Sequence, residues 1–403
     1  MVKEIKKNLY YIGVNDNEID LFEGQYKVPN GISYNSYILI DKKIVIFDTC
    51  DITKKEEWLK NVDEVLKKYA NSREPDYLVV SHLEEDHAGN IENLLNKYKN
   101  INVILNPISE KMFSQFFDID IENRKTIVKE GEEINVGENT LKFFMAQMVH
   151  WPEVMFTYVK GINVLFSADG FGKFGIPEKL IISSKDENIN NSWDNEARRY
   201  YINICGKYGM QVQNVLNKLI NSELELSTIC PLHGPILSED ISHFLNLYTK
   251  WSTYEPEEKG ALIVYGTIHG NTKDIANKMY NDLKQKGKNV RIMDIARCDM
   301  SEAISEAYKY SSLIIVCVTY NMSIFPNMNL YLNLLKEKNF QKRNIAIVEN
   351  GSWAPNVNNV VKDIFKNSKD INFIDPVVTI KSKLNGNTKK SLEQLEEKII
   401  EKI

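Results

Sequence analysis

The chain has 403 residues, of which 43% are hydrophobic and 26% are charged, and its formal net charge is −5 at pH 7. This length exceeds one ordinary hydrophobic core, so we expect two domains, and the composition excludes a disordered or fibrous chain. The acidic balance gives no support to nucleic-acid binding, and no apolar run approaches the length needed to span a bilayer.

The five cysteines are scattered and form no CxxC pair; they are Cys50, Cys205, Cys230, Cys298 and Cys317. We therefore expect neither a disulfide framework nor a rubredoxin-type iron centre in this chain. The first residues, MVKEIKKNLYYIG, carry charge and lack the apolar core of a secretory signal. These features predict a cytoplasmic protein.

The first half of the chain predicts strands separated by turns and a few helices. Strands are predicted at residues 34–41, 42–50, 75–82, 140–150, 163–172 and 226–235. Helices are predicted by apolar spacing at residues 54–69, 88–100 and 211–222, and we expect residues 186–193 to form a polar surface loop. Most of these strands end near a histidine or an aspartate, where loops can hold functional residues.

The pattern changes after residues 253–260, a polar stretch with proline and glycine that is typical of a linker. Beyond it, strands are predicted at residues 261–267, 289–295, 312–320, 344–351 and 371–379, with helices such as 272–287 and 328–339 between them. Alternating strands and helices predict a parallel sheet covered on both faces. Five such strands match the size of a flavodoxin-like domain, which binds its ligand at the carboxyl ends of the strands.

A group of potential metal ligands follows the strand at residues 75–82. The stretch SHLEEDHAGN, residues 81–90, holds two histidines and three carboxylates within six positions, so several of its side chains can converge on one point. Together with residues after other predicted strands, the candidate ligands are His82, Glu84, Asp86, His87, His150, Asp169 and His233. Four imidazoles and three carboxylates exceed what one tetrahedral zinc ion uses, so we predict two metal ions.

Glu84 bears on which metal binds. A hydrolytic zinc site would place a third imidazole at this position, whereas Glu84 supplies an anion. Two nearby cations repel one another, and a bridging carboxylate lowers that cost. Carboxylate-rich sites with open positions suit iron or manganese, and closed imidazole-rich sites favour zinc. We therefore predict a redox-active metal pair. His243, in a predicted helix, is expected to play no part, and Asp48 is expected to be structural or to support a ligand.

At this point the sequence resembles the flavodiiron proteins. Their motif is His-x-Glu-x-Asp-His, as in residues 82–87, whereas hydrolases of the same fold carry His-x-His-x-Asp-His. The similarity extends over HWPEVMFTY, SADGFG, EARRYYINI and PLHGP. It implies an α/β chain with a metallo-β-lactamase-like αββα sandwich at residues 1–252, a linker at 253–260 and a flavodoxin-like doubly wound parallel sheet at 261–403. It also implies the ligand sets: His82, Glu84 and His150 for one iron; Asp86, His87 and His233 for the other; Asp169 as the bridge.

Three predicted loops at strand ends of the second half suggest a flavin site. YGTIHGNT, residues 265–272, leads into a helix whose N-terminus can bind an anion, and residues 318–326 and 349–356 bring the aromatic residues Tyr320, Phe325 and Trp353 to the same edge. The first loop resembles the FMN-phosphate loop of the family, whereas the third, with Gly351-Ser352-Trp353-Ala354-Pro355, departs from its usual pattern. The predicted FMN-binding residues are Thr267, Ile268, His269, Gly270, Asn271, Thr272, Thr319, Tyr320, Asn321, Asn350, Gly351, Ser352 and Trp353.

The resemblance implies an oxidoreductase that reduces O2 to water, or NO to N2O, at two irons with no catalytic residue beyond the metal ligands. Electrons would pass through FMN from a separate donor, by resemblance a rubredoxin, in a head-to-tail homodimer or a dimer of dimers. No GxGxxG fingerprint supports direct use of NAD(P)H. The alternatives are a dinuclear metal hydrolase fused to a flavodoxin-like module, and an electron carrier with a vestigial metal domain.

Overall fold

The computed structural model describes residues 2–403 and divides into two compact units. The first unit comprises the residues up to Tyr201 together with Tyr208–Thr249, and the second comprises Ile202–Lys207 and Lys250–Ile403. The residues predicted as a linker are partly regular, because strand β19 already begins at Glu258. No helix within residues 2–403 is long and apolar enough to cross a membrane.

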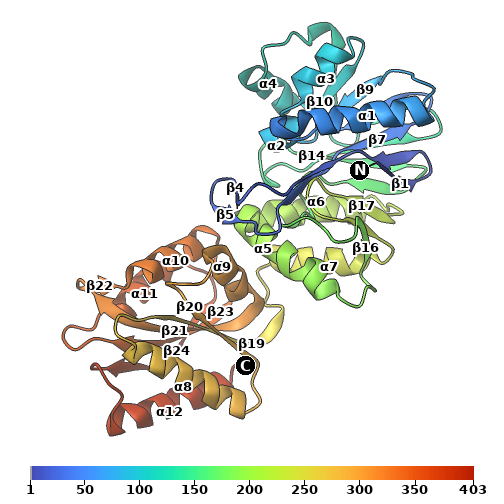
Figure 1. Cartoon of the computed structure of the whole chain (residues 1–403). Helices are drawn as coiled ribbons and strands as arrows, with labels where there is room; N and C mark the ends of the chain where they lie inside the picture. Colours follow the sequence, from blue (N-terminus) through green and yellow to red (C-terminus); the bar gives the residue numbers. More distant parts are fainter. Residues whose placement is uncertain (1) are drawn as a thin grey trace. The chain divides into compact units, whose positions relative to one another are not determined.

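The first unit contains two seven-stranded sheets (Figure 1). One sheet runs, in spatial order, β1 (Lys3–Lys6), β2 (Leu9–Tyr11), β7 (Tyr37–Ile40), β8 (Ile44–Phe47), β9 (Tyr77–Val79), β10 (Asn102–Leu105) and β11 (Lys125–Ile127). The other runs β12 (Glu133–Asn135), β13 (Thr140–Met145), β14 (Met155–Lys160), β15 (Val164–Phe166), β17 (Thr228–Cys230), β18 (Ile236–Ser238) and β16 (Ile181–Ser183). Two short two-stranded antiparallel sheets complete the unit. They pair β3 (Val14–Asp16) with β6 (Ile32–Tyr34), and β4 (Leu21–Phe22) with β5 (Tyr26–Lys27).

The core of this unit lies between the two sheets. Tyr37 and Phe47 from the first sheet and Phe143 and Phe166 from the second are almost fully buried in one cluster, and the rings of Phe47 and Phe166 stack with centroids 3.8 Å apart. Burying one face of each sheet against the other removes a large apolar area from water. The two sheets therefore form the rigid frame whose strand ends carry the site.

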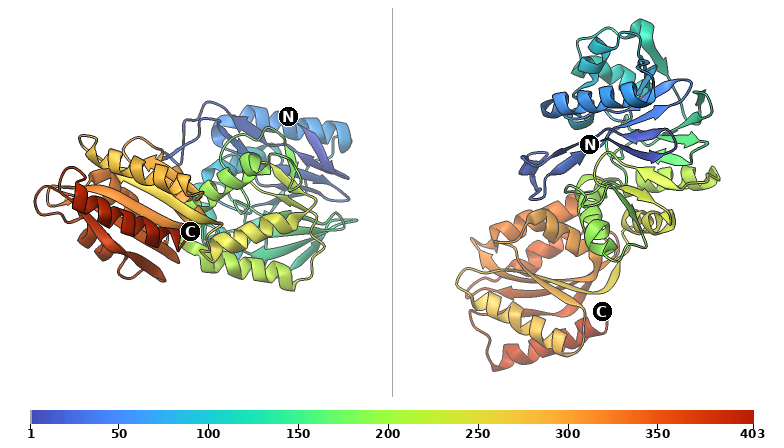
Figure 2. Two further views of the ribbon diagram at one scale, coloured as in Figure 1. Left: turned by 90° about the horizontal axis from the view of Figure 1, so that it is seen from below. Right: turned by 45° about the vertical axis from the view of Figure 1, so that its right-hand side comes forward.

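Helices cover the outer faces of both sheets, which completes the predicted αββα sandwich (Figures 1 and 2). They are α1 (Lys55–Tyr69), α2 (Glu85–Ala88), α3 (Ile91–Lys97), α4 (Pro107–Phe116), α5 (Asn195–Ile204), α6 (Gly209–Asn221) and α7 (Ile241–Ser252), with short η1 (Ile52–Lys54), η2 (Glu122–Arg124), η3 (Asn190–Asp194) and η4 (Gly206–Tyr208). The helix predicted at residues 88–100 is shorter, because it begins only at Ile91 and ends at Lys97 as α3, and the short α2 precedes it and ends at Ala88. The segment expected to be a surface loop contains η3, and its Trp193 is fully buried.

The second unit is a doubly wound parallel sheet. Its strand order is β20 (Val290–Asp294), β19 (Glu258–Gly266), β21 (Tyr310–Tyr320), β23 (Arg343–Asn350) and β24 (Ile371–Ile380), with the short β22 (Ser323–Ile324) antiparallel to β21. Helices α8 (Asn271–Gln285) and α12 (Gly386–Ile400) lie on one face of this sheet, and α9 (Met300–Lys309), α10 (Pro326–Glu337) and α11 (Val357–Phe365) lie on the other (Figure 1). The order reverses beside β19, and ligands bind at such a switch point.

Candidate metal centre

All seven predicted ligands lie at strand ends of the first unit. His82 and Glu84 follow β9, and Asp86 and His87 occupy the first turn after them, in α2. The other three come from the second sheet: His150 follows β13, Asp169 follows β15 and His233 follows β17. Their ligand atoms form two groups, one of His82, Glu84, His150 and Asp169 and the other of Asp86, His87 and His233, and within each group these atoms lie within 4.8 Å of one another.

The first group centres on the carboxylate of Glu84. Its Oε2 lies 3.2 Å from Nε2 of His82 and 3.1 Å from Nε2 of His150. Oδ2 of Asp169 lies 3.4 Å from Nε2 of His82 and 3.2 Å from Nε2 of His150. Two imidazole nitrogens and two carboxylate oxygens thus face one small volume.

The second group uses the other oxygen of Asp169. Its Oδ1 lies 3.1 Å from Nε2 of His87 and 3.6 Å from Nε2 of His233. Oδ2 of Asp86 lies 3.3 Å and 3.2 Å from the same two nitrogens. Because the two oxygens of Asp169 face different groups, this carboxylate is placed to bridge two cations.

Hydrogen bonds from the far side of two rings fix which nitrogen faces the centre. Nδ1 of His82 donates to Oε1 of Glu153 at 2.7 Å, and the backbone N–H of Leu83 donates to the same oxygen at 3.0 Å. Nδ1 of His233 donates to the carbonyl oxygen of Ser33 at 2.8 Å. In both rings Nε2 is left as the free ligand atom, the arrangement in which metal-binding histidines are usually held.

The carboxylates and imidazoles of the site shift one another's pKa values. Burial alone would raise the pKa of Glu84, but hydrogen bonds from His150 and His82 lower it to about 2. Burial would likewise lower the pKa of His150, but the nearby carboxylates of Asp169 and Glu84 raise it to about 9. Glu84 is therefore ionised, and in the absence of metal His150 holds a proton in place of a cation.

The buried carboxylate oxygens provide a test of whether the centre fits metal ions. Both oxygens of Asp86 and both of Asp169 are buried and accept no hydrogen bond from any residue in the described range 2–403. Buried anionic oxygens without donors are costly unless a cation pairs with them. The donor set of imidazole nitrogen and carboxylate oxygen suits iron and manganese, so the residues fit the predicted pair.

Asp48 lies close by but serves the backbone. Its Oδ1 accepts from the N–H of Ser81 at 2.7 Å, next to the first ligand, and burial raises its pKa to about 6. His243 instead pairs with Asp194 at 2.9 Å. Neither residue belongs to the two groups of ligand atoms.

In the second unit, a cavity of about 570 Å³ lies at the carboxyl ends of β19, β21 and β23. Eleven of the thirteen predicted flavin-binding residues line it; Gly270 and Tyr320 are not among the lining residues, and Val318, Met322 and Ser382 line it in addition. Gly270 precedes α8 with a φ of 93°, a left-handed conformation that favours glycine. The cavity therefore meets the N-terminus of α8, where backbone N–H groups attract a phosphate.

Hydrogen bonds join the loops that follow β21, β23 and β24 at this cavity. The side chain of Asn350 donates to the carbonyl of Ser382 at 3.0 Å and accepts from its N–H at 2.9 Å. The hydroxyl of Thr319 accepts from the N–H of Asn356 at 3.0 Å. The indole of Trp353 is 78% exposed, so a planar ring can lie against it. The fold, the hydroxyl-rich loop and the exposed aromatic together fit FMN.

Comparison with known families gives two matches. Residues 32–234 match the ODP family beta lactamase model, and residues 263–373 match the flavodoxin model. The first match alone covers half of the chain. The chain belongs to the flavodiiron family.

Relatives of this flavodiiron chain span nearly its whole length. It is 32% identical over 370 residues to an uncharacterized protein of Methanocaldococcus jannaschii, covering 91% of this chain and 90% of the relative. It is 27% identical over 354 residues to the anaerobic nitric oxide reductase flavorubredoxin of Salmonella paratyphi A, covering 87% of this chain and 72% of the relative.

The same fold is present in rubredoxin oxygen:oxidoreductase from Desulfovibrio gigas. The TM-score is 0.90 with 23% identity, over 100% of this chain and 98% of that one. The flavodiiron protein of Giardia intestinalis has a TM-score of 0.84 with 21% identity, over 100% and 96% of the two chains. The expected fold class, a metallo-β-lactamase-like domain followed by a flavodoxin-like domain, is confirmed.

Sequence reasoning missed the residues that orient the candidate ligands. Glu153 lies in the stretch HWPEVMFTY, but its position in the sequence does not predict its hydrogen bond with His82, 71 positions away. The Ser33 carbonyl could not have been found, because any residue type offers a carbonyl oxygen. Ser382 lies after the last strand, β24, and a predicted parallel sheet would have placed that strand end at the same edge.

Proposed function

We propose that this chain reduces O2 to water or NO to N2O with electrons from an external donor protein such as a rubredoxin. Position 84 carries the proposal: a carboxylate lies within 3.2 Å of Nε2 of both His82 and His150, where a hydrolytic zinc site would place a neutral imidazole. An anionic ligand stabilises the higher oxidation state of a redox metal. Membership of the flavodiiron oxidoreductase family supports the same reaction class.

In this proposal each of the seven side chains has a defined role. His82, Glu84 and His150 would hold one iron and Asp86, His87 and His233 would hold the other, and Asp169, whose two oxygens face different groups, would contribute to both. When bound, the two irons supply the redox chemistry of O2 or NO reduction, and FMN transfers electrons one at a time. Glu153 and the Ser33 carbonyl keep Nε2 of two rings directed at the centre.

The loops of the second unit hold the flavin. The N-terminus of α8 and the hydroxyls of Thr267 and Thr272 would hold the phosphate, and Asn321 and the loop from Asn350 to Trp353 would hold the remainder of FMN. The five free cysteines form no pair, so the donor's iron centre is expected on a separate protein. A head-to-tail dimer or a dimer of dimers would bring flavin and irons of two chains together.

The first experiment measures iron, zinc and phosphorus in anaerobically purified full-length protein, because phosphorus reports bound FMN. We expect about two irons and one phosphorus per chain, and O2 or NO consumption when chemically reduced rubredoxin is supplied. The two gases are compared under identical conditions, so the ratio of rates assigns the substrate. Two zinc ions that persist after iron-replete expression, without phosphorus, would overturn the proposal in favour of a hydrolase. Flavin without metal under the same conditions would favour an electron carrier.

Glu84→His separates the reductase from a dinuclear hydrolase. Replacing the anion by a neutral imidazole should shift the bound metal from iron towards zinc and lower gas consumption at least about tenfold. Glu85→His, the same change one position along at an exposed residue outside both ligand groups, serves as the control for the iron content. If Glu84→His kept its iron and its gas consumption, or gained ester or lactam hydrolysis, the redox interpretation would be wrong.

A further inference from the structure

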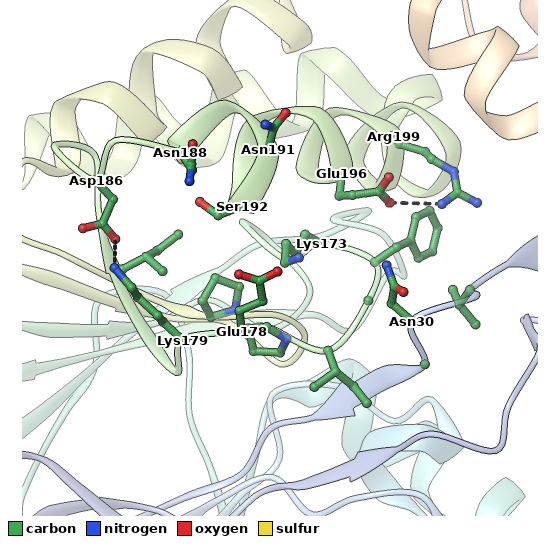
Figure 3. A pocket seen from close by; sticks show the side chains of 18 of the residues that line it. Asn30, Lys173, Glu178, Lys179, Asp186, Asn188, Asn191, Ser192, Glu196 and Arg199 are labelled. Carbon is green, nitrogen blue, oxygen red and sulfur yellow. Dashed lines mark hydrogen bonds and ion pairs between the residues drawn. The ribbon is translucent and has the colours of Figure 1, made fainter.

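A cavity of about 950 Å³ lies in the first unit and contains none of the seven candidate ligands. Three segments form most of its wall: residues 28–31 before β6, residues 173–179 after the Asp169 loop, and the stretch from residue 185 to residue 199 through η3 into α5 (Figure 3). The reaction proposed above makes no use of this cavity.

Lys173 brings a buried positive charge to the cavity. Its side chain is only 7% exposed, yet its ammonium makes no hydrogen bond or ion pair with the residues of the described range 2–403. The carboxylates whose charge raises the pKa of Lys173 are Glu196 and Glu178. Neither of them is close enough to form an ion pair with the ammonium. Burial lowers the pKa of this ammonium. Most of the side chain is removed from solvent and the ammonium opens only onto the cavity, so an anion bound in the cavity would be a favourable partner for it.

Gly234 keeps Lys173 in this position. A Cβ atom added at Gly234 would lie 2.6 Å from Cγ of Lys173, and the φ of 78° also favours glycine there. The Gly234 N–H is fixed by the hydroxyl of Ser33 at 2.8 Å. The lysine stem thus passes through a gap that only glycine leaves open, and its head is held at the cavity.

Arg199 places a second positive charge on the wall. It is 7% exposed, and its guanidinium donates to Oε2 of Glu196 at 3.0 Å and to the carbonyl of Lys27 at 2.6 Å. It also lies over the ring of Phe174, 4.8 Å from the centroid. Figure 3 shows the pair with Glu196 on the helix that borders the cavity. These contacts hold the guanidinium of Arg199 in position, and the carboxylate of Glu196 partly neutralises its charge.

The remaining wall selects the kind of anion. Asn30, Asn188 and Asn191 offer amide groups that can donate and accept hydrogen bonds. The charged side chains of the wall balance one another, with Lys173, Lys179, Lys185 and Arg199 against Glu178, Asp186, Glu187 and Glu196, so the carboxylates would repel a doubly charged phosphate more than a singly charged anion. A single negative charge with neutral polar groups around it suits this wall best.

We propose that this cavity binds a small monocarboxylate that bears hydroxyl or amide groups, with the carboxylate on the ammonium of Lys173 and the neutral groups on the asparagines. The pairing supplies the partner that the buried ammonium lacks. The carboxylate of the ligand would meet a positive charge that the folded chain already holds in position, and a preformed site of this kind increases affinity.

Calorimetry on the full-length protein with its cofactors tests this proposal, with gluconate and lactate as monocarboxylate probes and inorganic phosphate for comparison. We expect saturable binding of at least one monocarboxylate, tighter than that of phosphate. Lys173→Met, which keeps the stem and removes the charge, should weaken it at least about tenfold. Lys185→Met is the matched control, because Lys185 also lines the cavity but is exposed. Unfolding temperatures verify that both variants are folded.

A second variant fixes the sign of the ligand charge. Glu178→Gln removes a carboxylate that acts on Lys173, so monocarboxylate binding should strengthen a few-fold. Weaker binding in Glu178→Gln would show that the cavity prefers a cation and would overturn the proposal. The proposal is also wrong if phosphate binds more tightly than both probes, if Lys173→Met binds them as well as the unaltered chain, or if neither probe binds at concentrations up to about 10 mM.

Discussion

His82 is held from both ends of its ring. On one side Nδ1 donates to the buried Glu153, and on the other Nε2 faces the carboxylates of Glu84 and Asp169. The negative charge of Glu153 makes the imidazole a stronger donor to a metal and fixes its orientation. One carboxylate outside the ligand set thus governs both the geometry and the basicity of a ligand.

Glu153→Gln keeps the size of this side chain and removes its charge. We expect the affinity of the first metal position to fall by about tenfold to a hundredfold, measured by competition with a coloured chelator. Glu133→Gln is the control, because Glu133 forms an exposed pair with Lys160, at 2.5 Å, on the edge strand β12. Equal affinities in the two variants would show that the hydrogen bond to His82 has no influence on the metal.

Protons and metal ions compete for the same imidazoles. In the metal-free chain the pKa of His150 is raised to about 9 by Asp169 and Glu84, above its unperturbed value of about 6.5. A raised pKa stabilises the folded metal-free chain below the unfolded value, and this contribution is lost as the pH rises through about 9. Metal affinity should therefore increase from pH 6 to about pH 9 with release of protons. Titration with Mn2+ in unbuffered solution would measure that release, and a pH-independent affinity would contradict it.

At the scale of the elements, strand ends determine where both candidate sites lie. The start of α8 follows β19 through the turn of Thr267 to Gly270, whose N–H is held by the Thr267 hydroxyl at 3.2 Å. Thr267→Val removes this bond and one polar group of the cavity, so FMN affinity should fall about tenfold. Fluorescence of released FMN on dilution measures the affinity. Ser391→Ala, in α12 and outside the lining of the cavity, should change nothing; an equal loss in both variants would assign the effect to general destabilisation.

The element pattern also shows how far sequence reasoning reaches. Buried strands such as β9 and β19 are apolar runs that end in polar loops, so the candidate ligands and the flavin loops could be placed from sequence. Glu153 and Ser33 could not, because their contacts join residues 71 and 200 positions apart. The η3 segment was expected to be a loop because most of its residues are polar. The burial of its Trp193 depends on packing against Phe244, whose ring centroid lies 4.9 Å from that of Trp193.

At the scale of the whole molecule, each unit has a hydrophobic core of its own. Phe47, Phe143 and Phe166 belong to the core of the first unit, whereas Ile263 and Val316 belong to that of the second. The candidate metal ligands all come from the first unit and the flavin loops all come from the second. Loss of one cofactor should therefore act mainly on the stability of the unit that holds it.

Removal of the metal ions tests this division. A ligand present at about a thousand times its dissociation constant stabilises the folded state by about 4 kcal/mol, so chelation should lower the unfolding temperature of the first unit by about 10 °C. The second unit, followed by flavin fluorescence, should keep its transition. Asp169→Asn weakens the bridge between the two ligand groups, so its first unit should respond to the chelator much less than the unaltered chain. The buried carboxylates of the candidate ligands, Asp86 and Asp169, both lie in the first unit. A chelator that shifted both transitions equally would therefore show that the two cores unfold as one.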